Sequence, residues 1–236
     1  MKKTKQALSA LAAGAVLLAA LGGSATAAGS AAEEKLKALI DAGIISGDLK
    51  GNLNLGDNIT RAQLAVIMVR AFGLETEAKP PVQTASFTDV APGSWYSGYI
   101  AAAKNLIEDN GYTLGTGGGK FNPNGNVTSA EAVALLCKFL DIKPDSSTSD
   151  WASAYVKAAL EKGILDANSA KGISKTKPAT RETVFTYANT AFGKVKDEDG
   201  KTIFDKLKEG VGSGVYNKKR ERHRAVMFVT PGSSSA

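Results

Sequence analysis

Histidine and cysteine are almost absent from this sequence of 236 residues, and each absence excludes a class of chemistry. The one histidine, His223, lies in the basic run NKKRERHR, so the chain cannot build a histidine-based catalytic triad or a histidine-rich metal site. The one cysteine, Cys137, cannot form a disulfide within the chain. It lies among Leu135, Leu136 and Phe139, which favours a small buried hydrophobe over a reactive thiol.

Paired carboxylates and phosphate-binding loops are missing as well. Acidic side chains are scattered, and no motif places two of them together as a glycosidase requires. The stretch LGTGGGKFNPNGNVTSAE contains Gly119-Lys120, but Leu114 stands where a P-loop needs its first glycine and Phe121 where it needs a hydroxyl. The sequence therefore predicts a protein that is not an enzyme and that holds no cofactor and no metal.

Long apolar runs are limited to one, between residues 7 and 21. Three lysines precede it, and the small residues Ser24-Ala25-Thr26-Ala27 follow it. This pattern is typical of a secretory signal peptide, residues 1–27, cleaved after Ala27. We therefore expect an exported protein with no membrane span after signal cleavage.

The excess of positive charge is confined to the two ends of the chain. The net charge is +6, but residues 28–193 carry 16 basic and 17 acidic side chains. The body of the protein is therefore almost neutral, and no nucleic-acid partner is predicted for it.

An internal repeat accounts for most of the remaining sequence. In three places a glycine is followed by a threonine 17 residues later, and the pairs are Gly43 and Thr60, Gly111 and Thr128, and Gly163 and Thr180. Apolar residues recur at the same offsets after each threonine, with the spacing of an amphipathic helix that buries one face. Each threonine is placed to cap its helix, and Gln63 and Glu131 complete a capping box in the first two copies.

A second helix is predicted before each marker glycine. It begins at a tryptophan in two copies, WYSGYIAAAKNLIEDNG from Trp95 and WASAYVKAALEKG from Trp151. Four more residues separate the shared tyrosine from the glycine in the second copy, so its helix is predicted to be about one turn longer. The first copy has only EEKLKALIDAG, with Ala31 at the tryptophan position. The unit is thus helix, glycine-marked loop, helix.

These motifs resemble the S-layer homology domain. The resemblance rests on FTDVAPGSWYSGYI, FNPNGNVTSAE and ITRAQLAVIMVRAFGL, and it covers residues 32–193. It implies an all-α, pseudo-threefold domain of three repeats, with a central three-helix bundle, outer prong helices and Gly-rich loops. The expected boundaries are a signal peptide at 1–27, repeats at 28–78, 79–143 and 144–193, and a basic, partly disordered tail at 194–236.

The resemblance also implies a function. The family anchors exported proteins to the wall of Gram-positive-type bacteria by binding an anionic, often pyruvylated, secondary cell wall polymer attached to peptidoglycan. The expected location is therefore outside the cell, at the cell wall or S-layer. Two alternatives remain open, a structural subunit of the S-layer lattice and a truncated fragment of a larger anchored protein. The sequence does not determine the oligomeric state.

Arginines follow two of the capping threonines, and they are the main candidates for polymer contact. Arg61 and Arg181 stand at the first helical position, where free N–H groups already favour anions. A guanidinium there can bind a carboxylate with two parallel hydrogen bonds. The alternative is that Arg61 pairs with Asp57, and Arg181 with Glu182 or another surface acid. Ser129 replaces the arginine in the second copy, so its pocket is expected to be weak or empty.

Further residues are assigned to the polymer site by the same resemblance. They are Thr60, Thr180, Gln63, Glu182, Trp95, Trp151, Asp89, Asp150, Gly47 and Gly115. The two tryptophans could instead pack the prong helices against the bundle. The two aspartates could instead cap the helices that follow them.

The segment 194–236 differs in character from the repeats. KVKDEDGKTIFDKLKEG is compatible with a short helix or with the start of a further domain, and a basic run follows it. Such a run is usually a solvated segment, and it could also bind an anionic wall polymer through charge alone.

Overall fold

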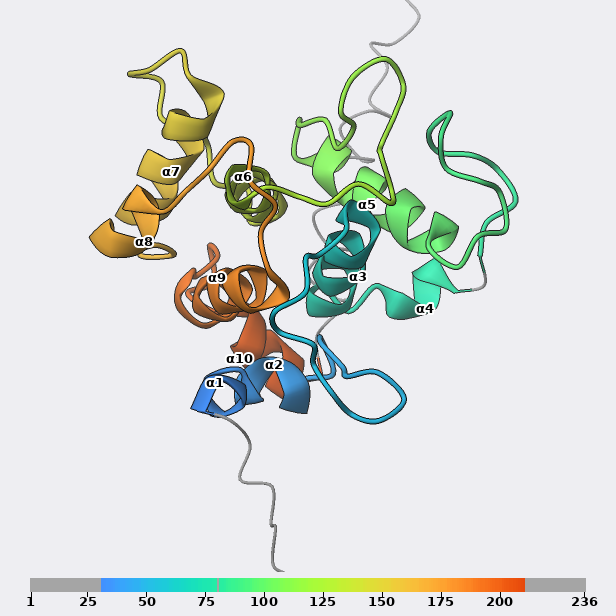
Figure 1. The fold of residues 1–236 in the computed structure, drawn as a ribbon, viewed down its shortest axis with the longest axis horizontal. Coiled ribbons are helices and arrows are strands. Elements are labelled where there is room, and N and C mark those ends of the chain that lie inside the picture. The colour runs from blue at the N-terminus through green and yellow to red at the C-terminus, as the bar shows by residue number, and fades with distance from the viewer. Residues whose placement is uncertain (1–30, 80, 211–236) are drawn as a thin grey trace, which may run out of the picture.

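The structure is a computed structural model that describes residues 31–79 and 81–210. This part of the chain consists of α-helices, loops and isolated β-bridges, which confirms the predicted all-α class. Figure 1 shows the helices gathered around α3, α6 and α9 near the middle of the molecule. The predicted signal peptide and residues 211–236 of the predicted tail lie outside the described residues.

Three central helices begin at the threonines that the repeat marks, and they are α3 (Arg61–Ala71), α6 (Ser129–Phe139) and α9 (Arg181–Lys194). Each threonine hydroxyl accepts the backbone N–H of the third helical residue. Gln63 and Glu131 return a bond to the threonine N–H, so the first two boxes are complete. The cap at Thr180 lacks this return bond, because Thr183 stands where the other two helices have Gln63 and Glu131.

The helices that precede the marker glycines differ in length, and they are α1 (Ala31–Lys35), α2 (Lys37–Asp41), α5 (Ser97–Asp109) and α7 (Trp151–Glu161). α5 runs ten residues past Tyr99, whereas α7 runs six past Tyr155, which confirms the longer helix of the second copy. α7 begins at its tryptophan as predicted. α5 begins two residues after Trp95, so that indole lies in the preceding turn.

Each preceding helix packs against the central helix of the repeat before it. α5 of the second repeat lies on α3, α7 of the third lies on α6, and α2 of the first contacts α9. Figure 1 shows α5 beside α3 and α7 beside α6. The order of packing is therefore cyclic.

Backbone hydrogen bonds close a ring among the segments that enter the central helices. The N–H of Ile59 donates to the carbonyl of Ala179 (3.3 Å), that of Ala179 to Val127 (2.8 Å), and that of Val127 to Ile59 (3.0 Å). All three residues are buried. One short segment from every repeat is thus held by both of the others.

A backbone N–H at the N-terminus of each central helix donates a hydrogen bond to a carbonyl in the loop of the next repeat. Arg61 N–H donates to Gly125 O (2.9 Å), Ala130 N–H to Ser174 O (3.1 Å) and Arg181 N–H to Asp57 O (2.7 Å). These helix N-termini therefore do not offer the free N–H groups that the sequence analysis expected for an anion. The physical reason is that the cyclic contact between repeats has already satisfied these donors.

Three shorter helices complete the described fold, and they are α4 (Glu75–Ala78), α8 (Ala167–Lys171) and α10 (Ile203–Lys208). α10 packs on α9, where the rings of Phe204 and Phe192 are 6.4 Å apart at their centroids. Of the two possibilities for the start of the tail, a short helix is present in the structure, and it packs against the repeats.

The core extends through all three repeats as one cluster of buried apolar side chains. Leu53, Phe121 and Ile173 are matched loop residues, because each lies ten residues after the glycine that marks its repeat. Leu53 and Phe121 are buried, and Ile173 is partly buried against the same cluster. Cys137 is fully buried, and burial raises the pKa of its thiol to about 12, so it is an inert core residue.

Candidate functional site

Arg61 is buried where the central helix of the first repeat contacts the loop of the second. We call each such contact between two repeats a joint. Only 5% of the Arg61 surface is exposed. Its Nε donates to Phe121 O (2.8 Å), its Nη2 donates to Leu114 O (3.0 Å), and its Nη1 lies 3.5 Å from the Glu131 carboxylate. The guanidinium also stacks over the Phe121 ring. Every nitrogen of this guanidinium thus has a partner in the second repeat, and the partner carboxylate is Glu131 rather than Asp57.

Arg181 occupies the same position at the joint between the third and first repeats, but it is less enclosed. Its Nε donates to Leu53 O (2.7 Å), the residue that corresponds to Phe121, and its guanidinium lies over the Phe185 ring. Burial lowers its pKa, and the charge of Asp57 opposes this shift. Within the described residues no carboxylate lies at ion-pair distance from Arg181, including Glu182, whose position is exposed.

Ser129 makes the corresponding joint between the second and third repeats without a charge. Its hydroxyl accepts the Ser174 N–H (2.8 Å) and lies 3.4 Å from the Ser174 carbonyl. Ser174 directly follows Ile173, the third of the matched loop residues. The three residues at this helical position therefore all bind the loop of the next repeat.

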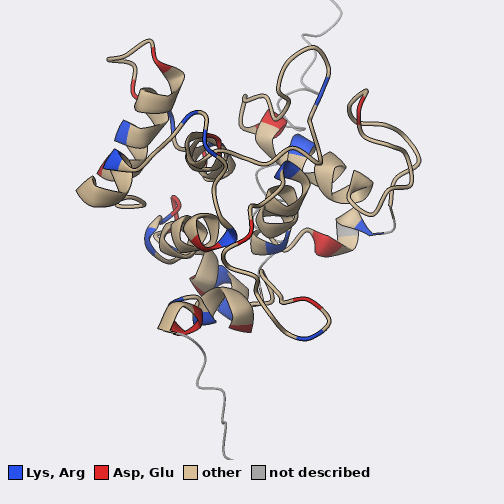
Figure 2. Cartoon of the chain, in the orientation of Figure 1, with Lys and Arg blue, Asp and Glu red and all other residues tan. Residues whose placement is uncertain are grey.

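A groove of about 210 Å³ opens beside Arg181, between α3 and α9. Its lining residues come from all three repeats, and they are Ile44, Ile45, Ser46, Ile59, Gln63, Val66, Ile67, Arg70, Trp95, Arg181 and Phe185. Two of these described residues are arginines and none is acidic. Charges of both signs are scattered over the rest of the molecule (Figure 2), so this groove differs from its surroundings.

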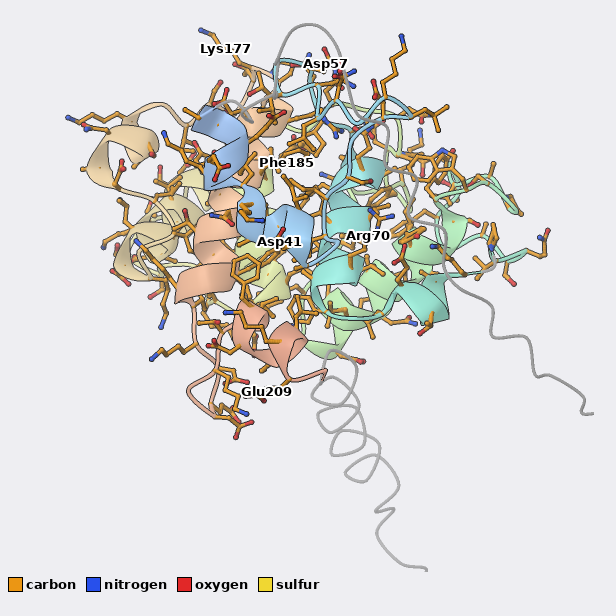
Figure 3. All side chains as sticks on the ribbon, turned by 90° about the horizontal axis from the view of Figure 1, so that it is seen from below. Asp41, Asp57, Arg70, Lys177, Phe185 and Glu209 are labelled. Carbon is orange, nitrogen blue, oxygen red and sulfur yellow. The ribbon has the colours of Figure 1, made fainter. Side chains whose placement is uncertain are left out.

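Arg70 supplies the second positive charge of the groove, near the end of α3 (Figure 3). Its Nε donates to Glu75 (3.2 Å). Glu75 also accepts hydrogen bonds from Lys79 Nζ and the Tyr99 hydroxyl, at 2.8 Å each. Lys79 first, then Tyr99 and Arg70, lower the pKa of Glu75 to about 2. Because Glu75 has these other partners, its charge remains compensated if the Arg70 side chain turns toward a ligand.

The two tryptophans predicted for the site are separated by the fold. Trp95 lines the groove and is 58% exposed, with its ring edge-on to Tyr96. Trp151 is the first residue of α7, is 47% exposed and does not line this groove. Neither indole is buried in the core, and each is about half exposed.

The two aspartates hold loops or helices in place. Asp150 caps α7 through the Ser153 N–H (2.8 Å) and pairs with Lys175 (2.7 Å). Asp89 does not cap a helix, because α5 begins eight residues later. Its carboxylate accepts the N–H groups of Phe121 and Asn122 (both 2.8 Å), which fixes the loop that Arg61 also holds.

Four more of the predicted site residues hold helices or loops in place and do not line the groove. Thr60 and Thr180 cap α3 and α9. Gly47 and Gly115 stand where a Cβ atom would lie 2.4 Å from the Gly51 backbone and 2.8 Å from Lys120 O, respectively. Close backbone approach therefore requires glycine at these two positions. Positive φ angles occur instead at other glycines, such as the marker glycines.

Sequence reasoning missed Arg70 and the wall formed by Ile44, Ile45 and Ser46. A usable signal was present in α3, where Gln63, Val66, Ile67 and Arg70 follow the i, i+3, i+4, i+7 rule beside the core stripe. No sequence spacing indicates that α9 provides the facing wall.

Comparison with known proteins identifies the repeats. The model of the S-layer homology domain family matches residues 26–65 and 86–133. Two segments of the chain therefore match the S-layer homology domain family. The matches cover most of the first repeat and most of the second, including the Thr60 and Thr128 motifs. The S-layer homology assignment of the third repeat rests on its matching spacing and on its place in the ring.

Several relatives are named as surface-layer proteins of Gram-positive bacteria. The chain is 29% identical over 209 residues to the "Surface-layer 125 kDa protein" of Lysinibacillus sphaericus, covering 80% of this chain and 17% of that protein. It is 31% identical over 145 residues to a "Surface layer protein" of Brevibacillus choshinensis, covering 61% and 12%. It is 36% identical over 112 residues to an uncharacterized cell wall amidase of Bacillus anthracis, covering 48% and 20%.

The chain therefore spans only a small part of each of these relatives. The named surface proteins support the predicted location, secreted and at the cell surface. One relative is named as an enzyme, a cell wall amidase, and the matched part is again a minor share of its length. Among the helices of the described residues, none is long and apolar enough to cross a membrane.

Proposed function

We propose that the S-layer homology repeats anchor an exported protein to the cell wall by binding an anionic secondary cell wall polymer in the groove between α3 and α9. One observation carries this proposal: the groove presents Arg70 and Arg181, an exposed indole, and no acidic side chain among the described residues that line it. The role is binding and involves no catalysis.

Charge complementarity indicates the kind of ligand. Arg181 uses its Nε for Leu53, so its two terminal nitrogens point to no acceptor among the described residues. These nitrogens suit a carboxylate or phosphate group, to which a guanidinium binds through parallel hydrogen bonds. A pyruvate ketal on a sugar provides such a carboxylate, and the polymer is proposed to be pyruvylated for this reason.

The exposed tryptophan suits the sugar part of the same ligand. The Trp95 indole presents an apolar face, and sites of this kind combine aromatic walls with a few polar groups that fix orientation. Apolar side chains such as Val66 and Ile67 continue this wall along α3. A short segment of an acidic glycan therefore fits the groove better than a purely apolar ligand.

Sedimentation with cell walls tests the proposal. The purified exported protein is mixed with sacculi from a bacterium that carries a surface layer, before and after the secondary polymer is stripped chemically. We expect sedimentation that requires the polymer and that Arg181→Ala reduces by roughly tenfold in affinity, since a hydrogen-bonded charge contributes about 1.5–3 kcal/mol. Equal sedimentation with stripped sacculi would remove the polymer from the proposal.

A structural subunit of the surface-layer lattice is the second candidate function, because two relatives are named as surface-layer proteins. Ordered sheets formed by the purified protein, seen by electron microscopy, would favour it. A protein that binds walls and forms no sheets would support the anchoring role.

A further inference from the structure

We infer that Gln63 keeps the groove between α3 and α9 open to anions, and that the corresponding carboxylate, Glu131, closes the equivalent joint, so that the three repeats form one working anion site. This inference rests on the proposed function, and it makes Gln63 the residue that determines which of the three joints binds the polymer.

Two of the joints between repeats share one design. An arginine at the start of a central helix donates its Nε to a loop carbonyl of the next repeat, Arg61 to Phe121 and Arg181 to Leu53. The third residue of that next repeat's central helix is Glu131 in the first of these joints, where it lies 3.5 Å from Arg61. In the other joint it is Gln63, which lines the same groove as Arg181. At this position the joint of Arg61 therefore has a carboxylate, and the joint of Arg181 has an amide.

Glu131 neutralises its arginine. Its Oε2 accepts the Thr128 N–H (2.8 Å), which completes the capping box, and its Oε1 lies 3.5 Å from Arg61 Nη1. One side chain thus caps α6 and compensates the buried guanidinium. This joint has no charge left for a ligand.

Gln63 cannot do the same for Arg181. Its Oε1 accepts the Thr60 N–H (3.0 Å) in the same capping geometry. The other terminal atom of the side chain is then Nε2, which is a donor. Gln63 and Arg181 both line the groove, and no described carboxylate lines it. The Asp57 carboxylate acts on Arg181 through its charge but is not at ion-pair distance. Two donor groups therefore line the groove, and an anion is the complementary ligand.

The third joint has no cation at all. Ser129 takes the arginine position and is bonded to Ser174, and Thr183 takes the position of Gln63. One joint is neutralised, one is uncharged, and the remaining one combines Arg181 of the third repeat, Gln63 of the first and Trp95 of the second. One polymer site per chain is the consequence.

The test replaces the amide by a carboxylate. Gln63→Glu preserves the capping box, because Glu131 completes the same box in α6. The new carboxylate is expected to pair with Arg181 and to weaken binding of polymer released from sacculi by roughly tenfold, with the melting temperature unchanged or raised. The matched control, Glu131→Gln, is expected to lower the melting temperature and to leave polymer binding at the wild-type level. Arg61 remains inaccessible to the polymer in this variant, because it is buried and its Nε and Nη2 stay bonded to Phe121 O and Leu114 O.

Three outcomes overturn the inference. They are a folded Gln63→Glu protein that binds polymer as the wild type does, a Gln63→Glu substitution that weakens binding equally in an Arg181→Ala background, and a calorimetric stoichiometry of two or three equal sites. A wild-type protein that does not bind the polymer would contradict the proposed function separately. The predicted pair between the new carboxylate at position 63 and Arg181 can then be tested through the melting temperatures of the Gln63→Glu, Arg181→Ala and double variants. If the effects of the two substitutions on the melting temperature are additive, the two positions are not coupled and the pair is contradicted.

Discussion

Two arginines that share a motif position differ in what their side chains bind. Arg61 has carbonyl or carboxylate partners for Nε, Nη1 and Nη2, whereas Arg181 has a protein acceptor for Nε. The motif specifies a guanidinium at the first helical residue, but burial and the neighbouring repeat decide whether that guanidinium holds the fold or faces a groove. The polymer-binding role proposed for both from the sequence is therefore better supported for Arg181.

Replacement of Arg61 is expected to destabilise the fold more than replacement of Arg181. Arg61→Ala leaves the Glu131 carboxylate and two loop carbonyls without their partner in a buried joint, which costs about 3–5 kcal/mol. Arg181→Ala is expected to cost about 1 kcal/mol, because that side chain makes one such bond. Urea unfolding of both variants measures the difference, and equal losses would contradict it.

The carboxylate of Glu75 is expected to make stability depend on pH below neutrality. Its pKa is lowered from 4.5 to about 2 in the folded protein, mainly by Lys79. Its stabilising contribution is therefore present above pH 4.5 and is lost as the pH falls toward 2. Glu75→Gln should be less stable than the wild type at pH 7, and the gap should close as the pH falls through this window. A gap that is independent of pH in chemical denaturation would contradict this origin.

Individual helices and loops follow local rules, and most of them could be predicted from sequence. The three threonine caps, the apolar stripes and the longer α5 depend on residues within a few positions of one another, so spacing reveals them. The facing partners could not be predicted in this way. Nothing in the spacing places the loop of the first repeat on the N-terminus of α9, or Trp95 beside Arg181. Asp89 was misjudged for the same reason, since its partners lie more than 30 residues away.

The glycine loop of the first repeat offers a prediction about one element. A Cβ atom on Gly47 would lie 2.4 Å from the Gly51 carbonyl group, so Gly47→Ala forces this loop to move, and we expect a loss of about 1–3 kcal/mol. Gly56 in the same loop has no atom within 4 Å of a Cβ and serves as the control. Gly56→Ala should be neutral or slightly stabilising in thermal unfolding. A neutral Gly47→Ala would show that the loop is not closely packed in solution.

The described part of the molecule is held together by the ring of hydrogen bonds through Ile59, Val127 and Ala179. Because each of these amides is buried and bonded to a different repeat, none can open while the other repeats stay in place. We expect the three amides to exchange hydrogen at the same slow rate, through global unfolding. Native-state hydrogen exchange checks this, and exchange of one amide well before the others would indicate repeats that open independently.

The cyclic packing limits what a single repeat can inherit when genes recombine. The groove takes an arginine from one repeat, an amide from another and an indole from the third. A repeat transplanted alone onto a cargo enzyme would carry a third of a binding site and would expose the faces that its two neighbours cover. The heritable unit of the proposed binding site is therefore the set of three repeats, and a substitution in any one copy acts on a surface that the other two complete.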